Sequence, residues 1–376
     1  MKSFGFVPVF PLHKSAACGG DSRKNAKGQL PELSCRRLLA KWHARYDGLP
    51  SMALLTAISQ EDARRLLGAY PVGPLESFEA LAAGSVNSNF SVQTGGHAPR
   101  QLFLRLYEEQ DRAGAEAETA MLERLGGAGV PVAPPVRRID GGLVSDVRGK
   151  PAALFDWRQG TIRCGARVTV EDARAVGRAL ARVHLAGARE VPKPSRFRFE
   201  DLSARLDRVA ASGDERFAPA VPALRDALQH AHEARPAGLP RGLIHGDLFR
   251  DNVLWASDGS LAALLDFESA CEGTFAYDLM VTILAWCVGE DLELQRARAM
   301  REGYEQVRPL EARERRALAA EGAFAALRFA VTRITDFGMR TAPGGPPPAR
   351  DWRRFMMRFD KLRTLGADGV RRALGA

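Results

Sequence analysis

Hydrophobic and polar positions alternate in the early part of the sequence, with the period of a β-strand that buries one face. Leu102, Leu104 and Leu106 show the pattern most clearly, because each is followed or preceded by a polar or bulky neighbour that would point the other way. Short turn-forming segments rich in Gly, Asn or Pro interrupt the alternation. The pattern predicts strands over residues 78–94, 101–107 and 151–157.

Apolar residues recur every three or four positions in most of the remaining chain, which is the period of an amphipathic helix. Ser59 with Asp62 three places later resembles a capping box, and Thr169 precedes an apolar stripe through Val176 and Leu180. Helices are predicted at about 59–69, 111–126, 169–188, 200–211, 218–235, 277–288, 291–305, 310–340 and 350–365.

These elements divide the chain into two parts of different character. Residues 52–157 are rich in predicted strands, and residues 158–376 are mainly helical, with short strands only at 242–244, 252–255 and 262–266. A length of 376 residues is also more than one small domain needs. We therefore expect an α+β fold with a small antiparallel-sheet N-terminal lobe and a larger helical C-terminal lobe.

The first 51 residues differ from the rest in charge and in pattern. They carry a net charge of +6, the remaining residues carry only +3 of the total of +9, and no periodicity is sustained. A secretory signal is disfavoured, because two prolines and His13-Lys14 interrupt the short apolar run. We expect a disordered leader, or a true start at Met52. Since the body is nearly neutral, its charge does not favour nucleic acid as a partner.

The five cysteines form no metal-binding or disulfide pattern, so reduced thiols are expected, with Cys271 and Cys287 packed in the interior. No apolar run reaches about 18 residues, the length that a transmembrane helix requires. Composition alone thus describes a globular protein with no membrane segment.

The segment from Gly242 to Phe267 carries the chemistry. His245, Asp247 and Asn252 have the spacing His-x-Asp-x-x-x-x-Asn of a kinase catalytic loop. In such a loop Asp247 would accept the proton of a hydroxyl group, and Asn252 would offer its amide oxygen to Mg²⁺. Asp266 follows the next predicted strand and would be the second metal ligand.

A surface turn is the alternative for this spacing taken alone. The short strands that surround the loop favour the kinase interpretation, because they would place oxygen ligands at both ends of one rigid segment. Within it, His245 is expected to hydrogen-bond the backbone and steady the loop rather than to act as a base. No Walker A motif is present, so the phosphates of ATP need another cradle.

Residues 84–90 are the candidate phosphate-binding loop, since this Gly- and Asn-containing segment lies between two predicted strands. Ser85, Asn87 and the neighbouring backbone amides would cover the phosphates as a nest of donors does. An ordinary hairpin turn is the alternative.

These segments resemble the choline/aminoglycoside phosphotransferase-like kinases and, within that superfamily, its homoserine kinase branch. The resemblance covers about residues 54–366. It implies a bilobal protein-kinase-like fold, ATP and Mg²⁺ as cofactors, and a small hydroxyl compound as the acceptor. The segments that carry it are Ala82–Phe90, His245–Leu254, Leu265–Cys271, Ala276–Leu279 with Ala285–Cys287, Ala326–Phe329 with Thr332–Asp336, and Arg350–Phe355.

Carried over to this sequence, the resemblance implies the same roles for the residues of the catalytic loop and adds nucleotide-binding residues. Glu118 takes the place of the acidic partner of a phosphate-binding cation. Arg105 stands where many relatives have Lys; it keeps the charge but binds phosphate differently, and a solvated strand face is the alternative. The linker at 153–157, with Phe155 and Asp156, would hold adenine.

Two departures from the family's pattern concern the acceptor. Arg250 stands where Pro is expected, and Glu268 where an aromatic residue is usual after the metal-binding Asp-Phe pair. If the acceptor is L-homoserine, its carboxylate needs a cation, and Arg328 and Arg333 are the candidates. A solvated or salt-bridged surface position is the alternative for each arginine.

Three hypotheses follow for function. The first is a cytoplasmic kinase that makes O-phospho-L-homoserine for threonine synthesis. The second is a related kinase for an aminoglycoside, choline, methylthioribose or a protein Ser/Thr. The third is a non-catalytic nucleotide-binding protein, which the intact Asp247, Asn252 and Asp266 disfavour. His184, on the helix that Thr169 begins, is expected to be a hydrogen-bonded core residue.

Overall fold

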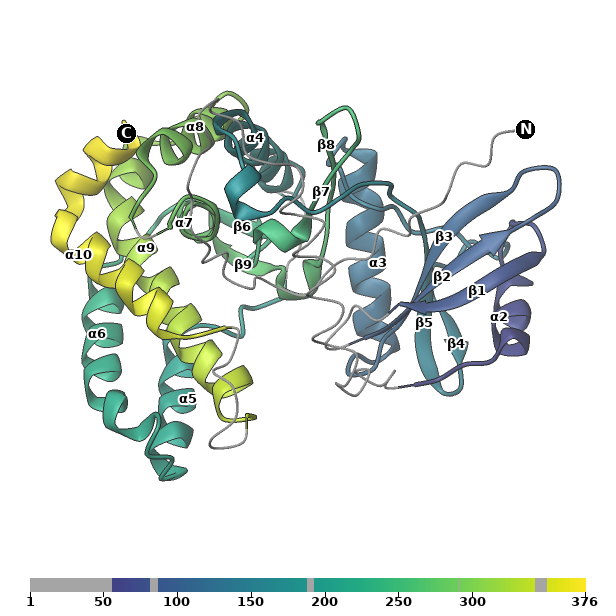
Figure 1. Ribbon diagram of the computed structural model, residues 1–376, viewed down its shortest axis with the longest axis horizontal. Helices are drawn as coiled ribbons and strands as arrows, with labels where there is room; N and C mark the ends of the chain where they lie inside the picture. The colour runs from purple at the N-terminus through teal and green to yellow at the C-terminus, as the bar shows by residue number, and fades with distance from the viewer. Residues whose placement is uncertain (1–55, 82–86, 188–192, 290, 342–349) are drawn as a thin grey trace, which may run out of the picture.

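The computed structural model describes residues 56–81, 87–187, 193–289, 291–341 and 350–376. They form two lobes side by side, a strand-rich lobe from the first part of the chain and a larger helical lobe from the rest (Figure 1). This architecture confirms the predicted α+β fold. The expected leader at 1–51, Ser85 and the proline-rich loop at 343–348 lie outside the described residues.

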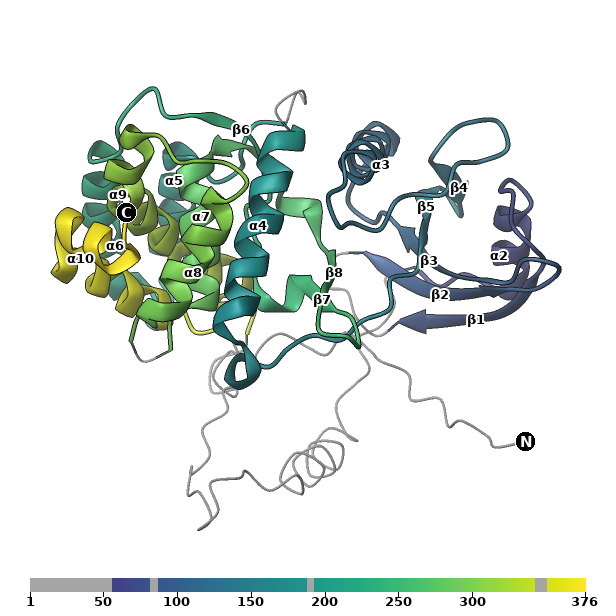
Figure 2. The same ribbon diagram turned by 90° about the horizontal axis from the view of Figure 1, so that it is seen from above.

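An antiparallel five-stranded sheet in the order β1-β2-β3-β5-β4 forms the N-terminal lobe. Its strands are β1 (Leu75–Leu81), β2 (Ser88–Thr94), β3 (Arg100–Leu106), β4 (Ser145–Val147) and β5 (Lys150–Asp156). The stretch expected as one strand over 78–94 is thus two paired strands, and the short β4 was not predicted. Helix α2 (Gln60–Leu67) packs at the outer end of this lobe, whereas α3 (Arg112–Gly127) lies on its side nearest the helical lobe (Figure 2).

The alternation in β3 produces two different faces. Leu102, Leu104 and Leu106 are fully buried in the core of the small lobe, as the sequence predicted. The residues between them, Phe103 and Arg105, point to the opposite face, because successive side chains of a strand alternate. One strand therefore supplies both a hydrophobic core and a charged side chain on the face toward α3.

Seven α-helices, several short 3-10 or π turns and two small two-stranded sheets make up the described part of the helical lobe. Strand β6 (Arg241–Ile244) pairs with β9 (Cys271–Thr274), and β7 (Val253–Trp255) pairs with β8 (Leu261–Leu264), both antiparallel. The helices are α4 (Val170–Ala186), α5 (Phe199–Ala211), α6 (Val221–Glu233), α7 (Phe275–Trp286), α8 (Leu294–Glu305), α9 (Ala312–Arg333) and α10 (Arg353–Leu374).

Two predicted helix starts have the expected caps. Ser59 and Asp62 form a reciprocal capping box before α2, and Thr169 and Asp172 do the same before α4. Each box satisfies backbone donors that a helix start would otherwise leave without partners. Further along α4, Gly177 faces α8 so closely that a Cβ on it would lie 2.0 Å from the Met300 carbonyl oxygen.

Every residue of α7 is buried, so this helix forms the centre of the large lobe. Asp278 is its one charged residue. Cys271 and Cys287 are buried free thiols, which confirms the packing predicted for them. In the described ranges, no helix combines the length and the apolar character that crossing a bilayer requires.

Candidate active site

The catalytic loop begins where β6 ends, and Asp278 of α7 fixes its backbone. The backbone N–H groups of His245 and Gly246 donate to the two carboxylate oxygens of Asp278, at 2.7 and 2.8 Å. Gly246 has φ +73°, a conformation that favours glycine. The loop therefore leaves the strand through a tight turn anchored on a buried carboxylate.

His184 of α4 completes this anchor. Its Nε2 lies 3.0 Å from Asp278 Oδ2, and its Nδ1 lies 2.8 Å from the Tyr304 hydroxyl. Burial lowers the pKa of His184, although the hydrogen bond to Asp278 acts in the opposite sense. The ring is fully buried and hydrogen-bonded on both nitrogens, which confirms the core role predicted for it.

His245 steadies the loop as expected. Its Nε2 lies 3.0 Å from the Leu265 carbonyl oxygen, and its Nδ1 accepts a hydrogen bond from the backbone N–H of Asp247 at 3.3 Å. Because both ring nitrogens are engaged within the protein, the imidazole ties the start of the loop to the segment that leads to Asp266.

Asn252 lies at the other end of the loop with its side chain held in one orientation. Its Nδ2 donates to the carbonyl oxygen of Asp247 at 2.8 Å. The amide oxygen of Asn252 therefore points away from that carbonyl, and it accepts no hydrogen bond from the described residues. An oxygen held in this way is a suitable ligand for a hard cation.

Asp266 and Glu268 follow strand β8. Asp266 has φ +61°, an uncommon conformation for a residue with a Cβ, and such residues occur often at functional sites. Glu268 accepts a 2.5 Å hydrogen bond from Asn87 Nδ2, across the two lobes. Burial raises the pKa of Glu268, while the charge of Arg105 acts against this. Glu268 thus faces the expected nucleotide-binding residues, and a role toward the acceptor stays a prediction.

Arg105 and Glu118 form the ion pair that the resemblance implies. Arg105 Nη1 lies 3.0 Å from Glu118 Oε1, and Glu118 also accepts hydrogen bonds from Tyr107 and Gln110. Burial opposes the charge of Arg105, but Glu118 and Glu268 outweigh it and raise the pKa of the guanidinium. The pair places a permanent cation between the sheet and α3.

The other residues expected to bind the nucleotide contact protein residues on both lobes. Asn87 connects the lobes, since it donates to Glu268 and accepts from the backbone N–H of Glu108. Phe155 is buried beside Phe103, and the Asp156 carboxylate forms an ion pair with Arg100. Their contacts with adenine stay predictions.

On the acceptor side, Arg328 lies beside the catalytic loop. Its Nη1 is 3.8 Å from Asp247 Oδ1, and its guanidinium lies between the rings of Phe197 and Phe329, at 3.9 and 3.8 Å from their centroids. Arg333 lies over Phe355 and donates to the Asp351 carbonyl oxygen. Arg250 begins the short turn that contains Asn252, and its guanidinium lies against Gly165.

Two groups of residues at the site received no role from the sequence. One is Asp278; a single charged residue inside the otherwise apolar helix Phe275–Trp286 was the signal that a buried partner existed. The other is a set of arginines at the start of α10. Only the tertiary structure shows that these arginines lie close to the end of α9.

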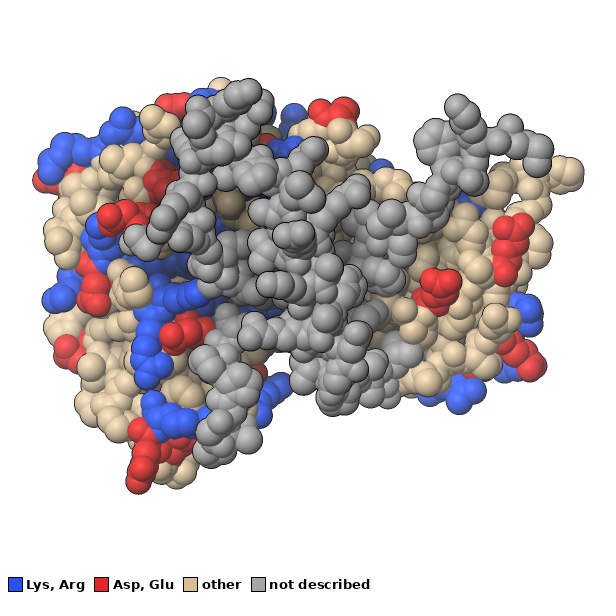
Figure 3. Space-filling model, in the orientation of Figure 1, with Lys and Arg blue, Asp and Glu red and all other residues tan. Residues whose placement is uncertain are grey.

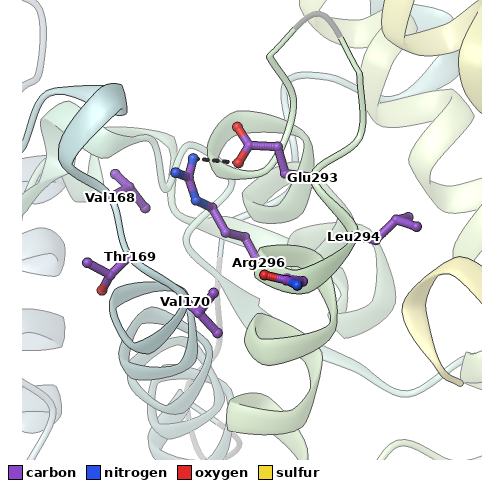
Figure 4. Close-up of a pocket in the computed structure, with 7 residues that line it drawn as sticks. Val168, Thr169, Val170, Glu293, Leu294 and Arg296 are labelled. Carbon is purple, nitrogen blue, oxygen red and sulfur yellow. Dashed lines mark ion pairs between the residues drawn. The ribbon is translucent and has the colours of Figure 1, made fainter. Parts of the chain in front are cut away.

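A separate pocket lies between the starts of α4 and α8 (Figure 4). It encloses about 390 Å³ and contains none of the residues of the catalytic loop. Its charged side chains neutralise each other, since Arg296 lies 2.8 Å from Glu293. The pocket is therefore not part of the candidate active site, and it is lined by Val168, Thr169, Val170, Glu293, Leu294, Gln295 and Arg296.

The fold joins a sheet lobe to a helical lobe. The first lobe contains the Arg–Glu pair, and the second contains a loop with Asp247 and Asn252. Together these features define a protein-kinase-like phosphotransferase. Comparison with known proteins agrees. The chain belongs to the phosphotransferase enzyme family, whose model matches residues 77–325. It is an enzyme that phosphorylates a hydroxyl group.

Individual relatives support this family and fold. A homoserine kinase of Rhizobium etli is 33% identical over 321 residues, which are 84% of this chain and 98% of that protein. A homoserine kinase of Caulobacter is 37% identical and covers 77% of this chain and 91% of its own length. The crystal structure of a choline kinase from Cryptosporidium parvum has the same fold, with a TM-score of 0.60, 11% identity, and coverage of 84% and 99%.

Proposed function

We propose that this enzyme transfers the γ-phosphoryl group of ATP to the hydroxyl of L-homoserine and so makes O-phospho-L-homoserine. The observation that carries the proposal is the identity of 33% to a homoserine kinase over 84% of the chain. The catalytic loop supports it, because Asp247, Asn252 and Asp266 are all present.

Asp247 is the group that accepts the proton of the acceptor. Its side chain is 22% exposed, so a hydroxyl can reach it, while the backbone on both sides is fixed by His245 and Asn252. As the hydroxyl oxygen bonds to the γ-phosphorus and the bond to ADP breaks, the hydroxyl proton passes to the Asp247 carboxylate. Arg328 Nη1, 3.8 Å away, places a positive charge beside this carboxylate.

Asn252 and Asp266 would hold Mg²⁺. These two side chains fit the cation, because the amide oxygen of Asn252 accepts no hydrogen bond from the described residues and Asp266 adds a carboxylate. Hard oxygen ligands are what this cation requires. When bound, Mg²⁺ neutralises part of the phosphate charge and orients the phosphates.

Arg105 supplies a second positive charge, for the phosphates. Glu118 holds the guanidinium in place from α3, and the pair is partly screened from water by its burial. Guanidinium groups bind phosphate oxygens through two parallel hydrogen bonds. We infer that Arg105 has the part that a lysine has in many related kinases.

ATP consumption by the purified enzyme against a panel of hydroxyl acceptors tests the proposed substrate. The panel contains L-homoserine, L-serine, choline, an aminoglycoside and methylthioribose, each compared with water as the acceptor. Homoserine is expected to give the highest kcat/KM. If another alcohol is turned over and homoserine is not, the assignment of homoserine is wrong.

Asp247→Asn tests the proposed base. It is expected to lower kcat by about 10²–10⁴-fold, the usual size of a proton-transfer contribution, while the KM for ATP stays unchanged. Asp226→Asn is a matched control, because Asp226 is an exposed residue of α6. Nearly full activity of Asp247→Asn would contradict this role.

A further inference from the structure

Five arginines from three segments converge on the acceptor side of the catalytic loop. One belongs to the loop itself, one ends α9, and three belong to the first part of α10 or to the residues just before it. On the face drawn in Figure 3, basic side chains gather on the helical lobe in the region of α9 and α10. We call this set the arginine cluster; it consists of Arg250, Arg333, Arg350, Arg354 and Arg358.

Two members of the arginine cluster share one aromatic ring. The guanidinium carbons of Arg333 and Arg358 lie 4.4 and 4.3 Å from the centroid of Phe355. Phe355 is fully buried and stacks on Phe329. The guanidinium of Arg328, which lies next to Asp247, packs over the ring of Phe329. A continuous stack of rings and guanidinium groups therefore connects the arginine cluster to the proposed base.

These arginines have no close ion-pair partner within the described residues, although Asp247, Asp251 and Asp266 lie within electrostatic reach of Arg350. None of the five arginines lies within 4.0 Å of an Asp or Glu oxygen, and Nη1 of Arg358 is buried without a hydrogen-bond partner. Elsewhere in the same lobe, Arg235 and Arg308 lie 2.9 and 3.0 Å from Glu321 and Glu314. Burial of like charges without a paired counterion is costly, so this arrangement of charges favours the binding of an anion.

The electrostatics agree with this geometry. Burial, followed by the charges of Arg350 and Arg354, lowers the pKa of Arg333 to about 10, and burial with Arg333, Arg250 and Arg354 lowers that of Arg358 to about 9. Both groups stay charged at neutral pH. Asp247 acts in the opposite sense on Arg333, which shows that the arginine cluster lies within electrostatic reach of the catalytic loop.

We propose that the arginine cluster is an anion-binding subsite that holds the carboxylate of the acceptor and selects alcohols that bear a carboxylate over amino alcohols that lack one. This inference rests on the proposed function as a kinase for such an alcohol. Planar guanidinium groups match the two oxygens of a carboxylate. A bound carboxylate would also relieve the repulsion between the arginines, whereas a cation such as choline would add to it.

A pair of acceptors that differ only in the carboxylate tests the selection. Removal of the carboxylate from L-homoserine gives 3-amino-1-propanol, which keeps the hydroxyl and the amine. In Arg333→Gln and Arg358→Gln, the KM for homoserine is expected to rise about 10–100-fold, the loss of one charge-assisted hydrogen bond. The KM for ATP and the kcat/KM for 3-amino-1-propanol should not fall. Arg363→Gln, an exposed position further along α10, is the matched control.

Thermal stability separates this role from a structural one. Substitution of either arginine removes a buried charge that has no ion-pair partner among the described residues, so the Tm of Arg333→Gln and Arg358→Gln should equal or exceed that of the wild type while homoserine binding weakens. Arg358→Lys, which keeps the charge, should recover part of the homoserine affinity. A lower Tm together with proportional loss of activity on both acceptors would overturn the proposal.

Calorimetry with L-2-aminobutyrate distinguishes this inference from the proposed function. This compound has the carboxylate and amine of homoserine but no hydroxyl, so it cannot be phosphorylated. Binding to the wild type that is lost in Arg333→Gln and Arg358→Gln supports the subsite, even if homoserine proves not to be the substrate. No binding to the wild type, or equal binding to all three proteins, overturns the subsite, even if homoserine is phosphorylated.

Discussion

At the scale of single residues, Asp247 and Asp278 show how position decides what a carboxylate does. Asp247 is partly exposed and lies beside Arg328, so its oxygens are open to an acceptor. Asp278 is fully buried, and its oxygens accept from His245, Gly246 and His184. Burial opposes its charge, yet the hydrogen bonds from His184 and from the backbone hold its pKa below the usual value.

Asp278→Asn should damage both stability and catalysis. An asparagine amide has one accepting oxygen, so at least one of the buried N–H groups of His245 and Gly246 would lose its partner. The expected loss is about 1–3 kcal/mol of unfolding free energy, measured by urea denaturation, and kcat should fall because the loop shifts. Unchanged stability and kcat would show that Asp278 does not anchor the loop.

At the scale of elements, helices α4 and α8 are packed more closely than side chains usually allow. Gly177 permits this, because even a methyl group there would lie 2.0 Å from the Met300 carbonyl oxygen. The contact matters for the site, since α4 also carries His184. Helix spacing at Gly177 thus helps to set the position of the residue that supports Asp278.

Gly177→Ala is therefore expected to push α4 and α8 apart and to lower the free energy of unfolding by about 1–3 kcal/mol, the usual cost of overpacking. Chemical denaturation measures the loss. Gly127→Ala is the matched control, because the Cβ added at that α3 position meets no atom within 4 Å. Equal stability of the two variants would contradict the importance of this close approach.

Elements with strong local signals were predictable, and elements that depend on distant partners were not. Thr169 with Asp172 marked the start of α4, and the alternation of Leu102, Leu104 and Leu106 identified β3. In contrast, β9 is only four residues long, contains Gly273 and exists because it pairs with β6. No local pattern could reveal such a strand.

The same distinction holds for the site. The spacing of His245, Asp247 and Asn252 was sufficient to predict a catalytic loop, because all three lie in one short segment. The hydrogen bond from Asn87 to Glu268 spans 181 positions, and the arginine cluster combines residues from 250 to 358. Charges that meet only after folding leave no spacing that a sequence can show.

At the scale of the whole molecule, stability should depend on pH through His184. Its folded-state pKa lies below the usual 6.5, so the unfolded chain binds the proton more readily. The stability linked to this residue is complete above about pH 6.5 and is lost as the pH falls toward the lowered folded-state pKa.

Thermal melts between about pH 7.5 and pH 5.5 test this dependence. The Tm of the wild type is expected to decrease toward the acidic end, and His184→Gln should show a lower Tm but a flatter dependence. His230→Gln, at an exposed position of α6, should behave like the wild type. A slope that persists unchanged in His184→Gln would assign it to other groups.

The anchoring of the catalytic loop on α7 has a consequence for how the enzyme fails on heating. The backbone N–H groups of His245 and Gly246 are bonded to a carboxylate inside the most buried helix of the lobe. Local opening would leave that charge without partners, so the loop cannot melt by itself while α7 remains packed. Activity and fold should therefore disappear in a single cooperative event, with no warm, folded and inactive state in between.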